Sequence, residues 1–141
     1  MGNKSLAIIK PDAMRANHFG KIIDRILTAG FKITELKIAR LTLAQAETFY
    51  AVHRERPFYG ELTSFMSSGP IMPIALEKDD AVTAFRDLIG ATNPAEATEG
   101  TIRKEFATSV GQNAIHGSDS DENAEKEVAF FFPTRDIQDN L

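Results

Sequence analysis

The chain has 141 residues, of which 43% are hydrophobic and 26% are charged, with a net charge of −4 and no cysteine. This composition is typical of a single globular domain, and the absence of cysteine excludes disulfides and cysteine-based zinc sites. The negative charge argues against a protein built around a basic nucleic-acid-binding stripe. The apolar start stops at Pro11 and no apolar window is long enough for a membrane span, so we expect a cytoplasmic protein without membrane association.

The first half of the chain predicts two strands and three helices. A short apolar run stopped by a proline predicts a buried strand, and apolar residues at helical spacing before Gly30 predict a helix that this glycine ends. Alternation then favours a strand, Thr42 is a suitable N-cap for the next helix, and Pro57 is suited to start another. These elements are expected at 5–10, 18–31, 31–41, 43–53 and 58–66.

The second half predicts two more strands. "IMPIALE" at 71–77 is a strand in which Pro73 favours an edge position or a bulge. Helices are expected at 78–90, which ends at Gly90, and at 101–107. A last helix is expected at 119–126, with Ser118 or Ser120 as its cap, and "EVAFFFP" at 127–133 is expected to form the final strand.

This order is a βαββαβ pattern with added helices. It predicts an α+β, ferredoxin-like sandwich with a four-stranded antiparallel sheet, in one domain that spans residues 1–141. The predicted loop from 91 to 120 is long for a compact domain, and such loops are commonly functional. It carries Thr92, Arg103, Asn113 and His116.

The motifs that are missing narrow the chemistry. The three histidines do not form a helical metal-binding pair, and "DSDENAEKE" fails as a calcium loop because Ala124 and Phe130 stand where glycine and glutamate are needed. We therefore expect no dedicated metal site. No glycine-rich phosphate loop is present either, so basic side chains and helix N-termini would have to hold any nucleotide. The candidates are Lys10, Arg54, Arg56, Arg86, Arg103 and Lys104.

Five segments together resemble the nucleoside diphosphate kinase family: "IIKPDA" at 8–13, "RPF" at 56–58, "SGPI" at 68–71, "GATNPAEATEGTIR" at 90–103 and "NAIHGSDS" at 113–120. The resemblance implies transfer of the γ-phosphoryl group from a nucleoside triphosphate, mainly ATP, to nucleoside or deoxynucleoside diphosphates. It implies a ping-pong mechanism through a phosphohistidine, Mg²⁺ carried by the nucleotide phosphates rather than by protein ligands, and a homo-oligomer, either a tetramer or a hexamer built from dimers. The tail after "FFFP" is short, and in the family it contributes to subunit contacts.

The resemblance also assigns roles to individual residues. His116 matches the phosphorylated residue, which attacks through Nδ1, Glu127 matches the acid that bonds the other ring nitrogen, and Ser118 matches the serine that contacts this acid. The base is expected to stack on Phe58, with Val110 on its other face. The phosphate and ribose shell would consist of Lys10, Tyr50, Arg86, Thr92, Arg103 and Asn113.

Plainer interpretations stay open for these residues. His116 could be an ordinary loop histidine, Phe58 a core residue, and Glu127 an exposed acid at the start of the last strand. Gly117 is expected to clear the approach to the imidazole, and Asp121 departs from the family by adding charge near the site. Two rival functions are an RNA-binding sheet that uses the aromatic run at 129–132, and a phosphohistidine carrier that donates to proteins.

Overall fold

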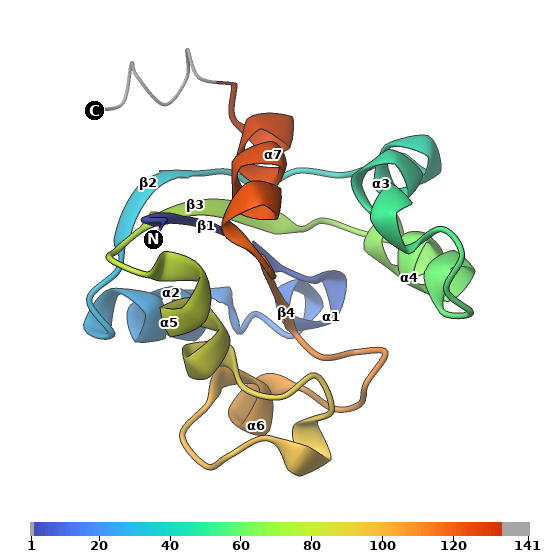
Figure 1. Cartoon of the computed structure of the whole chain (residues 1–141). Helices are drawn as coiled ribbons and strands as arrows, with labels where there is room; N and C mark the ends of the chain where they lie inside the picture. The colour runs from blue at the N-terminus through green and yellow to red at the C-terminus, as the bar shows by residue number, and fades with distance from the viewer. Residues whose placement is uncertain (1, 134–141) are drawn as a thin grey trace.

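The computed structural model describes residues 2–133, in which four strands form one antiparallel sheet with helices on both faces (Figure 1). The strand order is β2-β3-β1-β4, so β1 and β3 are central. This arrangement confirms the predicted α+β, ferredoxin-like class. The strands are β1 (Lys4–Ile9), β2 (Lys32–Leu36), β3 (Met72–Glu77) and β4 (Ile115–Gly117).

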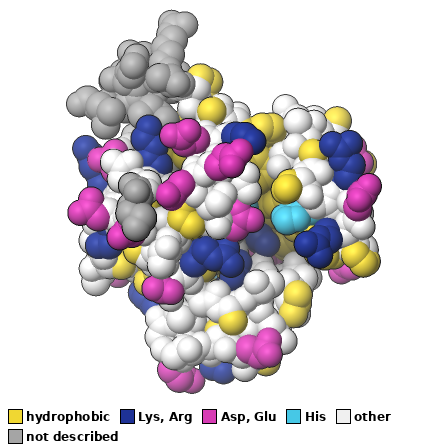
Figure 2. Space-filling model, viewed as in Figure 1, with side chains coloured by type: hydrophobic (Ala, Val, Ile, Leu, Met, Phe, Trp, Pro, Cys, Tyr) yellow, Lys and Arg dark blue, Asp and Glu magenta, His cyan; other side chains and the backbone are white. Residues whose placement is uncertain are grey.

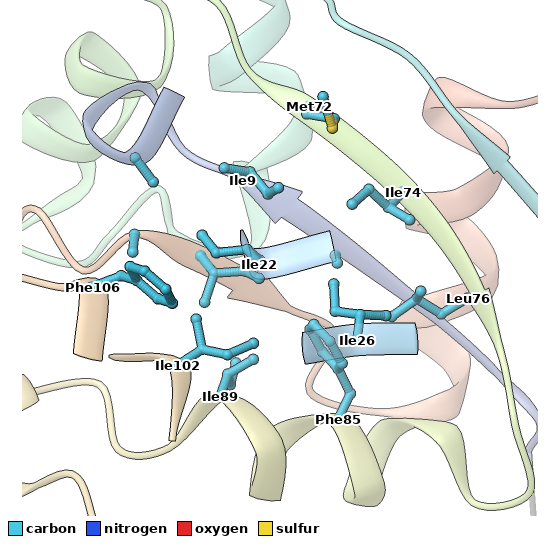
Figure 3. Close-up of a cluster of buried hydrophobic side chains, with 14 of the residues drawn as sticks. Ile9, Ile22, Ile26, Met72, Ile74, Leu76, Phe85, Ile89, Ile102 and Phe106 are labelled. Atoms are coloured by element: carbon cyan, nitrogen blue, oxygen red, sulfur yellow. The ribbon is translucent and has the colours of Figure 1, made fainter. Parts of the chain in front are cut away.

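Two helical layers cover the sheet because alternate strand residues point to opposite faces. On one face, Ala7 and Ile9 of β1 pack with α2, α5 and α6 in the apolar cluster of Figure 3. On the other face, Leu6 and Ile8 pack with side chains from α3, α4 and α7. The helices are α1 (Pro11–Arg15), α2 (Phe19–Thr28), α3 (Leu43–Phe49), α4 (Tyr59–Met66), α5 (Ala81–Ile89), α6 (Ile102–Phe106) and α7 (Asp121–Phe131), with short 3₁₀ turns η1 (Ala51–His53) and η2 (Pro94–Glu96).

Several local signals act as the sequence predicts. Thr42 caps α3 in a capping box, since its hydroxyl accepts from the Gln45 amide and the Gln45 side chain accepts from the Thr42 amide. Gly30 and Gly90 end α2 and α5 with φ values of 92° and 88°, a conformation that disfavours other residues. No helix within residues 2–133 is long and apolar enough to cross a membrane.

The last strand was predicted in the wrong place. Residues 127–131 continue helix α7, and the fourth strand is the three-residue β4, inside the segment expected to be a loop. Helix α7 extends because Ala124, Val128 and Phe131 recur at helical spacing and are buried together, which overrides the β preference of the aromatic run. Phe130 and Phe131 therefore lie on a helix, which removes the observation that favoured an RNA-binding sheet.

Pro73 lies in the central strand β3, so of the two predicted settings, an edge position or a bulge, the edge position is wrong. Its carbonyl accepts from the Lys37 amide, one residue past the end of β2. Since the N–H and C=O of a strand residue face the same neighbour, the missing N–H of Pro73 falls where β2 has already ended. The proline therefore breaks no bond between the named strands. A register shift does occur nearby, in β2 between Ile33 and Glu35.

Candidate active site

A cleft of about 710 Å³ opens beside the edge strand β4, and it is lined by residues from segments far apart in the sequence. Figure 2 shows lysine and arginine side chains gathered on this side of the molecule, beside a histidine. The lining brings together most of the predicted site: Lys10, Tyr50, Phe58, Thr92, Arg103, Val110, Asn113 and His116. It also includes His53, Glu61, Leu62, Phe65, Ser109, Gly111 and Gln112, to which the sequence analysis gave no role.

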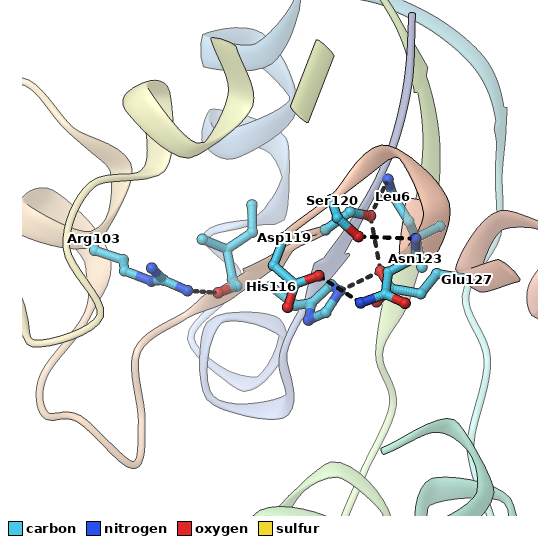
Figure 4. Close-up of polar contacts among 9 residues, drawn as sticks. Leu6, Arg103, His116, Asp119, Ser120, Asn123 and Glu127 are labelled. Carbon is cyan, nitrogen blue, oxygen red and sulfur yellow. Dashed lines mark hydrogen bonds and ion pairs between the residues drawn. The ribbon is translucent and has the colours of Figure 1, made fainter. Parts of the chain in front are cut away.

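The imidazole of His116 is held in place by two residues that follow it in the chain, Ser118 and Glu127. His116 pairs with Ile8 in the sheet, and its Nε2 lies 2.8 Å from Oε1 of Glu127, on helix α7. Ser118 donates its hydroxyl to the same oxygen at 2.8 Å and accepts from the amide of Leu6 at 3.0 Å, so the network is anchored on β1 (Figure 4). Glu127 is on a helix rather than at a strand start, and it contacts the imidazole.

This network fixes the form of the imidazole. A carboxylate can only accept a hydrogen bond, so Nε2 carries the proton in the neutral ring and Nδ1 keeps its lone pair. Within residues 2–133, Nδ1 makes no hydrogen bond. The His116 and Glu127 side chains are only 15% and 17% exposed, so the interaction is shielded from water. The arrangement leaves one ring nitrogen available as a nucleophile on the cleft side.

Two aromatic rings limit the motion of the imidazole. The ring centroids of Phe49 and Tyr50 lie 5.7 Å and 6.1 Å from that of His116, both edge-on. The Tyr50 hydroxyl is buried and has no hydrogen-bond partner within residues 2–133. Burial raises its pKa, and the charge of Glu127 adds to this effect, so Tyr50 stays protonated as a hydrogen-bond donor at the cleft. The sequence analysis did not predict the contact of Phe49 with His116, because the sequence pattern around Phe49 is that of an ordinary helix residue.

Two buried cations form the charged wall of the cleft. Lys10 and Arg103 are 7% and 8% exposed, and neither forms an ion pair within the described part of the chain. Lys10 donates to Oδ1 of Asn113 at 2.8 Å, and Asn113 donates to the carbonyl of Thr92 at 3.3 Å. Arg103 donates to the carbonyl oxygen of Ile115 at 2.7 Å (Figure 4) and to that of Gly90 at 2.9 Å.

Neither of these two charges is balanced by an ion pair within residues 2–133. Burial and, to a smaller extent, the charge of Arg103 lower the pKa of Lys10 to about 8, and the charge of Asp12 opposes this change. Burial likewise lowers the pKa of Arg103 to about 10, with a smaller contribution from the charge of Arg86. Buried charges are normally paired. Two of them side by side in an open cleft therefore indicate an anionic ligand.

The opposite end of the cleft is apolar and open. Phe58 and Val110 both line it and are 48% and 54% exposed. The ring of His53 lies 5.6 Å from that of Phe58 between centroids. Phe58 is therefore not a plain core residue, and an exposed aromatic face of this kind suits stacking with a flat ring.

Among the residues of the predicted phosphate and ribose shell, Arg86 is the one that does not line this cleft, and the other basic candidates Arg54, Arg56 and Lys104 do not line it either. It borders an adjoining depression of about 590 Å³ with Thr98 and Thr101, and the two hollows share Thr92 and Arg103. The charge of Arg86 still reaches the main site, since it lowers the pKa of Arg103.

The expected role of Gly117 is wrong. A Cβ at this position would come within 2.9 Å of Phe85 and 3.0 Å of Ile89, both on helix α5. Neighbouring strand residues face opposite sides, so a side chain at 117 would point into the core and not toward the imidazole. The glycine allows α5 to pack closely against β4, and this contact sets the depth of the strand that carries His116.

Within residues 2–133, no three or more histidine, aspartate and glutamate side chains are grouped so as to hold a metal ion. The cleft instead presents lysine, arginine, amide and hydroxyl groups, which bind phosphate oxygens directly.

Comparisons with known proteins agree with this geometry. Residues 3–137 match the family model described as nucleoside diphosphate kinase. A curated nucleoside diphosphate kinase from Flavobacterium psychrophilum is 59% identical over 95% of this chain and 96% of its own length. One from Chloroherpeton thalassium is 56% identical over 98% of both chains.

Solved structures show the same arrangement. The nucleoside diphosphate kinase of Aquifex aeolicus superposes with a TM-score of 0.94 at 47% identity, over 96% of this chain and 98% of that one. A halophilic nucleoside diphosphate kinase from Halobacterium salinarum, solved in complex with CDP, gives a TM-score of 0.90 at 35% identity, over 96% of this chain and 91% of that one.

Proposed function

The chain belongs to the nucleoside diphosphate kinase family, and we propose that it carries out phosphoryl transfer between nucleotides through a covalent intermediate on His116. It is an enzyme, a phosphotransferase of that family. One observation carries the proposal for His116: Glu127 holds the protonated Nε2 at 2.8 Å, and this leaves Nδ1 with a free lone pair at a cleft whose two buried cations form no ion pair within residues 2–133.

In the first half-reaction, the Nδ1 lone pair of His116 attacks the γ-phosphorus of a nucleoside triphosphate. A P–N bond forms, the bond from phosphorus to the bridging oxygen breaks, and the nucleoside diphosphate leaves with that electron pair. The ring becomes positive, and the carboxylate of Glu127 offsets this charge through the Nε2 proton. In the second half-reaction, a terminal oxygen of another nucleoside diphosphate attacks the same phosphorus, and Nδ1 leaves with its lone pair.

Phosphoryl transfer depends mainly on position and on stabilisation of spread negative charge. Lys10 and Arg103 are suited to supply fixed positive charge, because their buried positions require no rearrangement during the reaction. Tyr50, Thr92 and Asn113 would contact the phosphates or the ribose, and Arg86 would reach the phosphates from the adjoining depression. Their separate contacts with a nucleotide belong to the proposal.

Mg²⁺ is proposed as the metal, carried on the nucleotide phosphates. The basic lining and the lack of an acidic cluster within residues 2–133 fit a metal held by phosphates and water, as Mg²⁺ prefers. When bound, the ion would neutralise phosphate charge. Equilibrium dialysis without nucleotide should then show no tight Mg²⁺ binding.

At the open end, Phe58 and Val110 would take the base between them. Stacking serves every base because each has a π-face, so the enzyme should accept purine and pyrimidine diphosphates, with ATP as the main donor. The proposal includes a cytoplasmic location, where these nucleotides are available. It also includes a tetramer or hexamer built from dimers, supported by the exposed Leu36 and Ile38 at the β2 edge. The tail after Pro133, expected to take part in subunit contacts, lies outside the described residues.

The decisive experiment is covalent labelling. Incubation with γ-labelled ATP and Mg²⁺ without acceptor should give a label on the chain that is acid-labile and base-stable, as expected for a P–N bond. Addition of GDP or CDP should discharge it into the triphosphate. The His116→Asn variant should bind nucleotide but take no label. A label that survives acid, or that persists in His116→Asn, contradicts the proposal. A label that passes only to a protein and never to free diphosphates would indicate a carrier.

A further inference from the structure

The backbone is strained two residues before His116. Ala114 is fully buried and has a φ of 71°, which residues other than glycine rarely adopt. The amide of Ile115 donates to the carbonyl of Asn113 at 2.8 Å, so the bond closes a turn around Ala114 alone. A turn of this kind with a positive φ at its centre is rare and strained. Such strain persists only where neighbouring groups hold it.

The neighbouring groups come from the junction between β1 and α1. The carboxylate of Asp12 accepts from the amide of Ala114 at 3.0 Å, and the amide of Lys10 donates to the carbonyl of Ala114 at 2.9 Å. Both backbone polar groups of Ala114 are therefore held from one segment. Of these two bonds, the one to Asp12 involves a side chain, and the one to Lys10 is between backbone groups.

The turn lies between two parts of the cleft. Asn113, on one side, is bonded to the amine of Lys10, and His116 follows on the other side after a single buried residue. Strand β4 has only three residues and lies at the sheet edge, so its own ladder fixes little. The turn at Ala114 therefore sets the position of the imidazole relative to Asn113 and Lys10.

The second carboxylate oxygen of Asp12, Oδ1, indicates that this residue is placed for its bond to the turn and not to stabilise its own segment. Oδ1 is buried and has no hydrogen-bond partner within residues 2–133. A buried, half-satisfied carboxylate is costly. Within residues 2–133, no group at the start of helix α1 donates a hydrogen bond to Oδ1, so the cost of burying this oxygen is not offset there. In the described part of the chain, the carboxylate of Asp12 makes one hydrogen bond, the one it accepts from Ala114.

We propose that Asp12 is a positioning residue, whose carboxylate holds Ala114 in the strained turn that places His116 and Asn113 against the same phosphoryl group. This inference rests on the proposed role of His116. It differs from a role in which the charge of Asp12 supports the protonated amine of Lys10, and the two roles make opposite predictions for two variants.

The test is a double-mutant cycle measured as the single-turnover rate of His116 labelling. Asp12→Ala removes the acceptor and should lower this rate about tenfold to a hundredfold, since small misplacement of reacting groups has effects of that size. Asp12→Asn keeps an acceptor oxygen without charge and should retain most of the rate. Ala114→Gly makes the positive φ inexpensive, so Asp12→Ala in that background should recover roughly threefold or more.

The opposite pattern would overturn the inference. If the charge on Lys10 is what matters, Asp12→Asn will be as slow as Asp12→Ala, Ala114→Gly will rescue neither, and the alkaline limb of the pH profile will move. If Asp12→Ala fails to fold, Ala114→Gly should restore folding, and its failure to do so also counts against the turn. The exposed Asp24→Asn on α2 is the control. Labelling of another residue in the wild type would instead refute the role of His116 itself.

Discussion

At one end of the cleft, the polar groups bond to one another and to the sheet, whereas at the other end Phe58 and Val110 are about half exposed. The His116 end is anchored through Ser118 to the amide of Leu6 in a central strand. The open end is carried on loops and a helix start outside the sheet. Under the proposed function, this contrast predicts that the phosphates, which every substrate shares, meet rigidly held groups, whereas the base, which varies, meets mainly exposed apolar side chains.

The contrast predicts different kinetic effects at the two ends. Substitutions at the anchored end should lower kcat, because they disturb groups that act on the reacting phosphorus. Substitutions at the open end should raise KM with little change in kcat, because they remove binding that is equal in the ground and transition states.

The largest effect after loss of His116 itself is expected for Arg103→Ala. This variant removes a buried charge and leaves the carbonyls of Gly90 and Ile115 without their donor. We expect kcat to fall by about 10²–10³, the usual result of deleting a fixed donor at a developing charge. Steady-state kinetics would measure it, with the exposed neighbour Lys104→Ala as the matched control. A near-normal kcat in Arg103→Ala would contradict the expected difference between the two ends of the cleft.

Lys10 predicts a pH dependence in which activity and stability move in opposite directions. Its pKa falls from an ordinary 10.5 to about 8 because of burial. The free enzyme therefore loses this charge as pH rises through about 8, and kcat/KM should decline there. Between about 8 and 10.5 the unfolded chain binds a proton that the folded chain does not, so this group makes the free energy of unfolding rise with pH.

The variant Lys10→Met should remove both trends. It should be weakly active at all pH values, without the alkaline decline of kcat/KM, and denaturant titrations should lack the rise in stability above about pH 8. Lys21→Met on the exposed surface of α2 is the control and should retain both trends. An unchanged alkaline limb in Lys10→Met would assign that limb to another group.

A smaller effect is expected for Glu127→Gln. The amide can still accept from Nε2 through its oxygen, but it carries no charge to offset the ring charge that develops as His116 is phosphorylated. The labelling rate should fall by about tenfold to a hundredfold, the range found when the hydrogen-bond partner of a metal-bound histidine is removed. Binding of nucleotide should change little. Glu125→Gln, exposed on the same helix, is the control, and equal rates in the two variants would contradict the role of Glu127.

The sequence predicted the parts of this molecule that depend on local signals. The apolar spacing of α2, the capping residues Thr42 and Ser120, and Gly30 and Gly90 each act within a few residues, so their effects can be read directly. The candidate site residues could be named because the resemblance tied distant segments together. Among them, the structure brings His116, Glu127 and Ser118 into hydrogen-bond contact.

The elements that the sequence missed depend on tertiary contacts. Strand β4 is three residues long and exists because β1 pairs with it, which no periodicity reveals. Helix α7 has a strand-like aromatic end that remains helical because the Lys37 amine bonds the carbonyl of Phe131 and the buried stripe packs on the sheet. The interaction of Asp12 with Ala114 spans 102 positions in the chain, and neither residue carries a local signal for it.

The smallest effect is expected at the open end, for Phe58→Ala. Base stacking contributes about 1–3 kcal/mol where it has been removed by alanine substitution, so KM for nucleoside diphosphates should rise roughly tenfold while kcat changes little. The rise should be similar for GDP, CDP and UDP, because a π-face does not distinguish the bases by hydrogen bonds. Val52→Ala, an exposed apolar residue on η1 outside the cleft lining, is the control. A fall in kcat that exceeds the rise in KM, or an effect confined to one base, would show that the open end takes part in the chemistry or in base selection, and the division between the two ends would not hold.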